Sequence, residues 1–165
     1  MPAMSEMLRG VLAKEYVECP AMRGIAATDA ITKTIKPAAR VQLWLVQMLL
    51  PDLVAAIERM IVEQADNHPL RRLLGGLLTY VYNPLDLIGD DTPLGRVDDT
   101  IICALGLLRG AEVEHVELDP DVRAMCEYAA SALPSLSEDL NDSIRAFVRD
   151  LESSTRSVKS LHAYP

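Results

Sequence analysis

Aliphatic residues recur at helical spacing along most of this chain, and few β-branched runs interrupt them. In the stripe Val97, Ile101, Leu105 and Leu108, every step is three or four residues, which places all four side chains on one face of a helix. Half of the 165 residues are hydrophobic and only 4% are aromatic, so the core must be aliphatic. The sequence therefore predicts an all-α fold: one domain over 1–165 that forms a compact bundle of six to eight helices with short connections.

Proline divides the helical pattern. Pro51 removes a backbone donor, so the apolar run Val41–Leu50 should kink or restart there. Because this run is apolar almost all round, we expect it to be the central, buried helix. Within it, Trp44 is expected to anchor the core, with ligand stacking as the alternative. Gln42 and Gln47 are expected at the surface, with an internal polar pair as the alternative.

Two adjacent glycines, Gly75 and Gly76, interrupt the next apolar helix, which is predicted over Leu70–Tyr82. Each glycine costs roughly 1 kcal/mol relative to alanine inside a helix. A close approach of two helices would compensate for this cost, against Ala104 or Gly106 on a later helix. The alternative is a simple break of the helix at this point.

The charge of the chain is −8. No basic cluster is larger than Arg71-Arg72, whereas nucleic-acid binders carry a basic face. Five acids without a lysine or arginine lie in Glu112–Asp121, which is typical of a solvated loop. The low-charge runs Val41–Leu50 and Thr100–Leu108 are shorter than the roughly 20 residues that span a bilayer, and no secretory signal is visible. We expect a cytoplasmic protein without a nucleic-acid partner or a transmembrane segment.

The three cysteines, Cys19, Cys103 and Cys126, are widely spaced and odd in number, which fits neither a disulfide framework nor a zinc pattern. We expect them to be small buried hydrophobic residues in a reducing compartment. The three histidines are scattered along the chain, and none has a second ligand at helical spacing. A metal site made of histidine and cysteine is therefore not predicted.

The most unusual stretch, 80–99, carries five aspartates, two prolines and two glycines between two apolar helices. Asp86 would occupy the third position of a turn that starts at Pro84. Asp98 and Asp99 would occupy the opening turn of the next helix, where negative charge is favourable. The favoured interpretation is that each aspartate caps a helix or forms a turn, so that the stretch is an ordered connection.

The same carboxylates support a second hypothesis. If the turn folds back, Asp86, Asp90, Asp98 and Asp99 could converge, and crowded carboxylates either bind a hard cation or raise one another's pKa. This hypothesis predicts a Ca²⁺ or Mg²⁺ site, and a metal ion bound there could also assist a hydrolysis reaction. The spacing is not that of an EF-hand loop, and no Ser/His or Cys/His pair adjoins it, so no catalytic residue is assigned and no other cofactor is predicted.

The residue order in 80–109 also matches a known pattern: Tyr80, then Pro84-Leu-Asp-Leu-Ile, Asp90, Pro93, Gly95 and Asp98-Asp99. It resembles the signature of the YkvA-like family, a small helical bacterial domain whose function is not established. This chain has Gly89 where the family usually has proline, and its interval from Pro93 to Gly95 is one residue shorter. The resemblance implies a helical domain, marks the four aspartates named above as site candidates and implies no reaction. It also implies that some relatives associate with membranes.

Three functions follow as hypotheses. The favoured one is a non-catalytic module that binds a protein partner or itself, because no catalytic constellation is visible in an unusually apolar chain. The second is a divalent-metal-binding protein or metal-dependent hydrolase that uses Asp86, Asp90, Asp98 and Asp99. The third is a peripheral membrane protein that inserts a helix such as Val41–Leu50. The serine-rich end, 153–165, is expected to be a flexible tail.

Overall fold

The computed structural model describes residues 37–83, 87–88 and 94–161, and within these the side chains of 37–38 and 156–161 are not described. This part of the chain is helical and contains no strand, so the all-α prediction is confirmed for it. The total of six to eight helices stays a prediction, because residues 1–36 lie outside the described part. In chain order the elements are α4 (Pro37–Gln47), α5 (Leu50–Glu63), α6 (Pro69–Val81), α7 (Val97–Glu114), α8 (Pro120–Ala130), the 3₁₀ turn η1 (Leu133–Ser135) and α9 (Glu138–Leu161).

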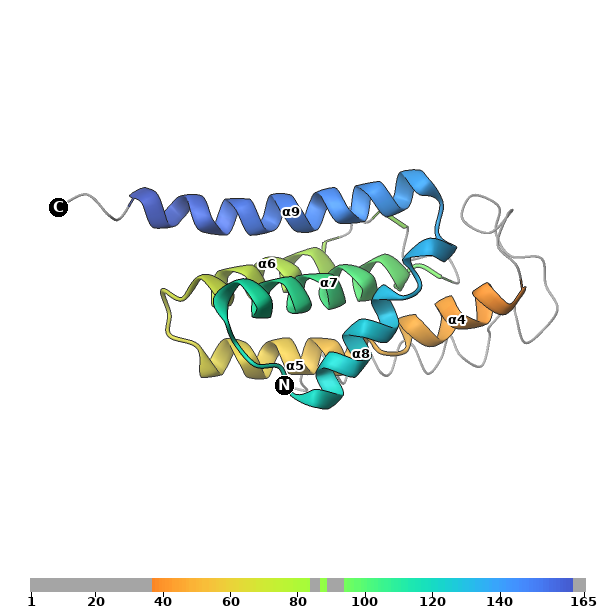
Figure 1. Cartoon of the computed structure of the whole chain (residues 1–165), viewed down its shortest axis with the longest axis horizontal. Helices are drawn as coiled ribbons and strands as arrows, with labels where there is room; N and C mark the ends of the chain where they lie inside the picture. Colours follow the sequence, from red (N-terminus) through yellow and green to blue (C-terminus); the bar gives the residue numbers. More distant parts are fainter. Residues whose placement is uncertain (1–36, 84–86, 89–93, 162–165) are drawn as a thin grey trace.

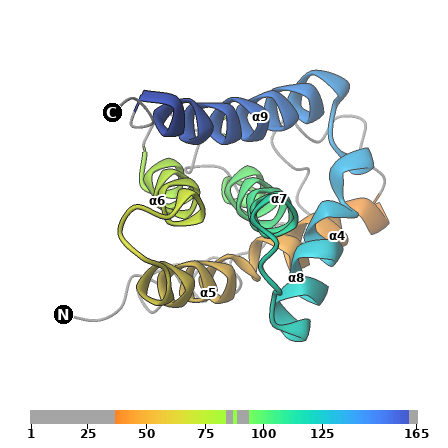
Figure 2. The same cartoon turned by 60° about the vertical axis from the view of Figure 1, so that its left-hand side comes forward.

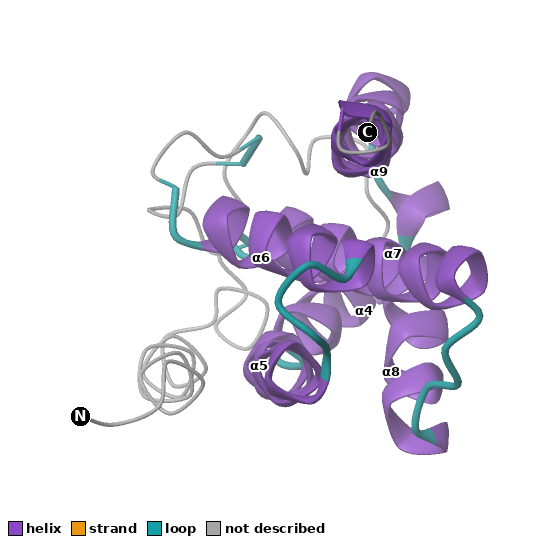
Figure 3. Cartoon of the chain, turned by 90° about the vertical axis from the view of Figure 1, so that its left-hand side faces the viewer, coloured by secondary structure: helices purple, strands orange, loops and turns teal. Residues whose placement is uncertain are grey.

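The helices form layers around the adjacent pair α6 and α7. Helix α9 covers one face of this pair and α5 covers the opposite face (Figures 1 and 2). Helices α4 and α8 pack against α7, and α8 also contacts α5. The view in Figure 3 separates α9, the α6–α7 pair and α5 as successive levels. One cluster of buried hydrophobic residues runs through the helices from α4 to α9.

The central helix is α7, because it packs against each of the other described α-helices. The expectation that Val41–Leu50 forms the central helix is therefore wrong. Helix α4 buries only one face, and Val41 and Leu45 on its other face remain 51% and 48% exposed. Apolar composition all round a helix is compatible with a central position, but the number of neighbouring helices decides whether both faces are covered.

Two glycines on α7 explain how α6 comes so close. A Cβ atom on Gly106 would lie 2.6 Å from Cδ2 of Leu77, and a Cβ on Gly110 would lie 2.5 Å from Cδ2 of Leu73. Both leucines belong to α6 and are one helical turn apart, as are the two glycines. Leucine side chains of α6 therefore fit into a groove that exists only because α7 lacks two Cβ atoms.

The adjacent glycines of α6 have a different role from the one that the sequence suggested. A Cβ on Gly76 would collide with Leu151 of α9, whereas a Cβ on Gly75 would meet nothing within 4 Å. A close helix approach does exist between α6 and α7, and Gly106 takes part in it as predicted. However, it is α7 that supplies the small residues, and Gly76 serves the contact with α9.

The region around Pro51 follows the prediction more closely. Helix α4 ends at Gln47, and α5 starts with Pro51 in its first turn, so the predicted restart is confirmed. Trp44 is 5% exposed and belongs to the core, as predicted. Gln47 is fully buried, which corrects its expected surface position. It lies one turn after Leu43 and one turn before Leu50, and both of these leucines are also buried.

The acidic stretch Glu112–Asp121 is only partly a loop. Helix α7 continues through Glu114 and ends at His115, whose backbone is left-handed (φ 54°). Asp119 then caps α8, because its side chain accepts hydrogen bonds from the N–H groups of Asp121 and Val122. Helix α9 extends to Leu161 and so includes part of the segment expected as a tail. Among the described helices, none has both the length and the apolar character that a bilayer crossing requires.

Candidate functional site

The corner between the end of α6 and the start of α7 contains the buried polar groups of the acidic stretch. Tyr80, in the last turn of α6, is 6% exposed, and its ring packs on Phe147 of α9 with ring centroids 4.6 Å apart. The Tyr80 hydroxyl donates a hydrogen bond to Oδ2 of Asp98 at 2.8 Å and accepts one from the Leu87 N–H at 3.1 Å. A single side chain therefore connects α6, α7, α9 and the segment between α6 and α7.

Asp98 is fully buried in the first turn of α7. In addition to the Tyr80 hydroxyl, its Oδ2 accepts the N–H of Ile88 at 3.1 Å. Among the described residues, its Oδ1 has no hydrogen-bond partner. The position in the opening turn is as predicted, but Asp98 is not the N-cap. Arg96 occupies the N-cap position, and its side chain makes no capping hydrogen bond. The Asp98 carboxylate instead accepts hydrogen bonds from the Tyr80 side chain and from the segment that connects α6 to α7.

Burial dominates the electrostatics of this pair. It raises the pKa of Asp98 above the usual 3.8, even though the hydrogen bonds from Tyr80 and Ile88 act in the opposite direction. Burial and the nearby Asp98 charge also raise the pKa of Tyr80 far above the usual range of a phenol. The Tyr80 hydroxyl therefore keeps its proton at neutral pH and serves as a hydrogen-bond donor, not as a base.

Asp99 has a different partner, although it is equally buried. Its Oδ2 accepts a hydrogen bond from Nη1 of Arg96 at 2.9 Å, and the same nitrogen donates to the carbonyl of Val81 at 3.2 Å. The Arg96 side chain is only 17% exposed. This ion pair therefore neutralises a buried carboxylate and also bonds a carbonyl at the end of α6, which a helix otherwise leaves without an intrahelical partner.

The structure brings two of the four predicted metal ligands, Asp98 and Asp99, into the same turn. Asp86 and Asp90 lie outside the described residues, so the four-carboxylate cluster stays a prediction. Within the described ranges 37–83, 87–88 and 94–161, no three side chains of His, Cys, Asp or Glu gather in an arrangement that could hold a metal ion.

The remaining residues that could carry chemistry have structural positions. His68 caps α6, because its Nδ1 accepts the N–H of Leu70 at 3.2 Å, and His115 ends α7. Cys103 and Cys126 are buried free thiols, as predicted for these two residues. Burial raises the pKa of Cys126 to about 12 and that of Cys103 well above the usual 9.0. Both thiols are therefore protonated and poor nucleophiles at neutral pH.

The sequence analysis did not predict that Tyr80 bonds both Asp98 and the connecting segment, or that Arg96 bonds the Val81 carbonyl of α6. A signal for both was present. Tyr80 opens the motif, and Arg96 is its only basic residue, so each was the natural partner of a buried carboxylate. The missing information was burial, since an exposed Asp98 or Asp99 would have needed no such partner.

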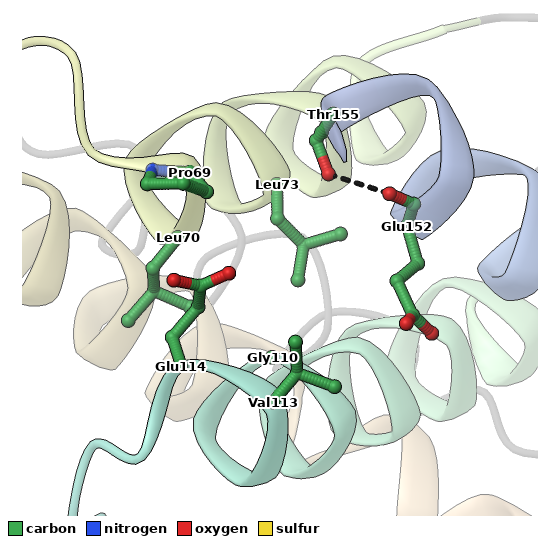
Figure 4. Close-up of a pocket in the computed structure, with 8 residues that line it drawn as sticks. All are labelled: Pro69, Leu70, Leu73, Gly110, Val113, Glu114, Glu152 and Thr155. Carbon is green, nitrogen blue, oxygen red and sulfur yellow. Dashed lines mark hydrogen bonds between the residues drawn. The ribbon is translucent and has the colours of Figure 1, made fainter. Parts of the chain in front are cut away.

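Described residues outside this corner also line two hollows. The first, between α6, α7 and α9, has a volume of about 10 Å³, roughly the space of one water molecule. Figure 4 shows the side chains around it, with Leu73 between the helices and the carboxylates of Glu114 and Glu152 on its border. Glu152 is already engaged, because its carboxylate accepts from Nε of Arg109 at 3.1 Å and its carbonyl from the Thr155 hydroxyl at 2.8 Å.

The second hollow, termed the acidic pocket here, has a volume of about 220 Å³ and lies between the end of α5 and the segment that joins α7 to α8. Its charged residues are Glu63, Glu117, Asp119 and Arg59, so three acids face one base. The full lining is Arg59, Met60, Glu63, Gln64, Val116, Glu117, Leu118, Asp119 and Val122.

A further candidate surface is the outer face of α4. Val41 and Leu45 are one turn apart and about half exposed, and Met48, one further turn on, is only partly buried. We call Val41 and Leu45 the α4 ridge. Exposed single hydrophobic residues are ordinary, but two on one turn of a helix that contains a single charged residue form a continuous apolar strip.

The hydrogen bonds of the corner thus join Tyr80, Ile88 and Asp98, which all belong to the part of the chain that resembles the YkvA-like signature. Comparison with known proteins adds nothing to this resemblance, which stays a prediction. The chain matches no protein-family model, no curated protein and no solved structure.

Proposed function

We propose that this protein is a non-catalytic helical module that binds further copies of itself through the α4 ridge. The observation that carries this proposal is the exposure of Val41 and Leu45, at 51% and 48%, on a helix whose opposite face is buried against α7. Covering the exposed half of each side chain contributes on the order of 1 kcal/mol. The two together therefore supply the apolar centre of a small interface, to which polar contacts at the rim would add.

The interior of the α6–α7 corner supports a structural role for its acids. Oδ2 of Asp98 accepts two hydrogen bonds, and Asp99 pairs with Arg96 inside the protein. A catalytic carboxylate must reach the substrate directly or through one water, whereas both of these side chains are fully buried. In this proposal the corner fixes the angle between α6 and α7, and the binding surface lies elsewhere.

Sedimentation velocity tests the proposal. The wild-type protein should sediment as an assembly larger than one chain of 18.1 kDa, and Val41→Ser/Leu45→Ser should sediment as a single chain. Val62→Ser is the matched control, because Val62 is an isolated aliphatic residue on α5 with 81% exposure, and it should assemble like the wild type. A wild-type protein that stays monomeric up to its solubility limit refutes self-association.

A second candidate function is divalent-cation binding at the corner, with Asp86, Asp90, Asp98 and Asp99 as ligands. One observation favours it: Oδ1 of Asp98 is buried and has no hydrogen-bond partner among the described residues. A hard cation would supply the missing interaction of this oxygen.

Calorimetric titration with Ca²⁺, Mg²⁺ and Mn²⁺ tests the second candidate. Binding predicts heat and a higher melting temperature for the wild type, and both should disappear in Asp98→Asn. Asp142→Asn, which removes an exposed carboxylate on α9, should keep the response. Absence of both heat and a melting shift in the wild type eliminates the cation site.

The resemblance of Tyr80–Arg109 to the YkvA-like family is also a proposal. Its support is that Tyr80 and Ile88, at two positions of the signature, both donate hydrogen bonds to Asp98, at a third. A signature that encodes a buried hydrogen-bond network would constrain the identity and order of these residues without requiring a shared reaction.

A further inference from the structure

The acidic pocket combines a buried apolar lining with a charged border. Met60, Leu118 and Val122 line it and are buried, so they form its apolar floor. Glu63 and Glu117 belong to the same lining but are exposed, so they border its opening. A ligand that matches this arrangement has an apolar body and one polar end.

The charged side chains of the pocket favour a cation. Glu63, Glu117 and Asp119 face a single base, Arg59. Asp119 already accepts two N–H groups of the first turn of α8. Among the described residues, by contrast, no hydrogen bond or ion pair engages the side chains of Glu63 and Glu117. These two carboxylates are therefore available to a ligand.

The helix ends around the pocket act in the same direction. The pocket includes Met60 and Glu63 in the last turn of α5, and its second segment begins one residue after His115, where α7 ends. The carboxyl end of a helix carries a partial negative charge and attracts cations. The first turn of α8 contributes the opposite sign, but the Asp119 carboxylate already caps it.

The shape of the pocket selects an organic cation. Within the described ranges 37–83, 87–88 and 94–161, no three side chains of His, Cys, Asp or Glu converge as a metal ion requires. An ammonium group on an aliphatic chain needs no such convergence, because the chain contacts the apolar floor and the charge meets one or two carboxylates. The volume of about 220 Å³ is below the roughly 300–1,000 Å³ of typical small-molecule sites, so the chain must be short.

We propose that the acidic pocket binds a short-chain alkylammonium group, supplied by a free amine or by a lysine side chain of a peptide. The floor covers the alkyl chain, and Glu63 and Glu117 hold the ammonium group. Arg59 opposes the ligand charge and limits the affinity. The inference does not depend on the proposed self-association, because the α4 ridge contributes no residue to the pocket.

Titration of the isotope-labelled protein with pentylammonium chloride, followed by amide NMR, tests the inference. The amide signals of residues 116–118 should shift and saturate. Pentanol, which has the same chain without the charge, should bind several-fold more weakly. Methylammonium, which has the charge without the chain, should also bind more weakly, because each methylene group that the floor covers raises the affinity by up to about fourfold.

Variants with opposite changes of charge should give opposite results. Glu63→Gln/Glu117→Gln keeps the size of both side chains and should weaken pentylammonium binding by roughly two- to fivefold for each carboxylate. Arg59→Gln removes the opposing base and should tighten binding by a similar factor. Partial unfolding cannot explain a gain of affinity, and the amide spectrum of each variant reports its fold. Asp142→Asn/Asp150→Asn, which removes two exposed carboxylates of α9, should bind like the wild type.

The outcomes are distinct from those of the self-association experiment. The variant Val41→Ser/Leu45→Ser has an unchanged pocket and should keep the wild-type affinity for pentylammonium. Absence of saturable shifts at residues 116–118 overturns the inference, and so does binding that neither the double glutamine variant nor Arg59→Gln alters. A terminally blocked peptide with one lysine separates the two sources. If it binds at least as tightly as pentylammonium, the ligand is a lysine side chain, and weaker binding assigns the pocket to a free amine.

Discussion

The hydroxyl of Tyr80 donates a hydrogen bond of 2.8 Å to Oδ2 of Asp98, in the buried corner between the end of α6 and the start of α7. The same hydroxyl oxygen accepts the Leu87 N–H. The pair thus fixes the connecting segment by a tertiary network and not by local capping. Because unmet hydrogen bonds are costly in a buried site, the stability of the protein should be sensitive to each member of this network.

Replacing Tyr80 by phenylalanine should lower the free energy of unfolding by about 1–3 kcal/mol, because it removes a donor from Asp98 and an acceptor from the Leu87 N–H. Urea denaturation measures the loss. Tyr82→Phe is the control, since Tyr82 is 43% exposed, and its effect should stay within about 0.5 kcal/mol. Equal losses in the two variants would contradict the role assigned to Tyr80.

The raised pKa of Asp98 gives a pH dependence with a defined sign. Between its ordinary pKa of 3.8 and its raised value in the folded state, folded Asp98 binds more protons than unfolded Asp98. Its contribution to stability is therefore complete below pH 3.8 and is lost as the pH rises through the folded pKa. Asp98→Asn removes this titration and keeps one oxygen as an acceptor.

The measurement is the unfolding free energy of the wild type and Asp98→Asn at several pH values from 3.5 to 7, a range about the ordinary carboxyl pKa. The stability of Asp98→Asn relative to the wild type should increase with pH. Subtracting the two curves removes the titration of the other acids. A difference that is independent of pH would show that burial does not perturb this carboxyl.

Breaking the Arg96–Asp99 ion pair should be costly because Asp99 is fully buried. Arg96→Met should destabilise the protein by about 3–5 kcal/mol, since it leaves a buried carboxylate without its cation and the Val81 carbonyl without a donor. Arg109→Met breaks ion pairs with Glu112 and Glu152, but the Arg109 side chain is 49% exposed, so it should cost far less. Thermal melting compares the two variants, and a similar drop for both would be the contradicting result.

Replacement of glycine by alanine should have opposite effects on the free energy of unfolding at two positions. Gly75→Ala should stabilise by about 0.5–1 kcal/mol, because a Cβ there meets nothing within 4 Å and alanine favours the helix. Gly106→Ala should destabilise by about 1–3 kcal/mol, because its Cβ would overlap the fully buried Leu77 side chain. Chemical denaturation of both variants tests this, and stabilisation by Gly106→Ala would mean that α6 can move away.

Cys103 and Cys126 should resist alkylation in the native protein. Both thiols are buried, and burial raises the pKa of Cys126 to about 12. Iodoacetamide at pH 8 should therefore leave Cys103 and Cys126 unmodified in the native protein and label both in guanidinium chloride. Mass spectrometry of the peptides that contain them measures the labelling. Rapid labelling of Cys126 in the native protein would reveal frequent opening of α8.

Several features of the fold could be read from local sequence because their causes are local. Pro51 restarts the helix wherever it lies, since it lacks an N–H. Asp119 caps α8 through bonds to residues two and three positions later. The aliphatic spacing of α7 likewise required a helix, and Asp98 and Asp99 were placed correctly in its opening turn.

The candidate site was harder to predict because its contacts join residues far apart in the chain. Asp98 bonds Tyr80, 18 positions away, and no spacing rule links them. Local reasoning placed Asp98 in the opening turn of α7, but it considered only nearby backbone N–H groups as donors. In the buried corner, a tertiary donor and the Ile88 N–H take that place.

The sequence by itself determined the helices and their ends, because hydrogen bonding along the backbone and the positions of proline and capping residues act over a few positions. Tertiary packing alone decided which helix is central. Helix α7 contacts each of the other described α-helices, and Gly106 and Gly110 let the leucines of α6 approach it closely. Helix α4 was left with an exposed ridge, because burial depends on how many helices surround a segment and not on its own composition alone.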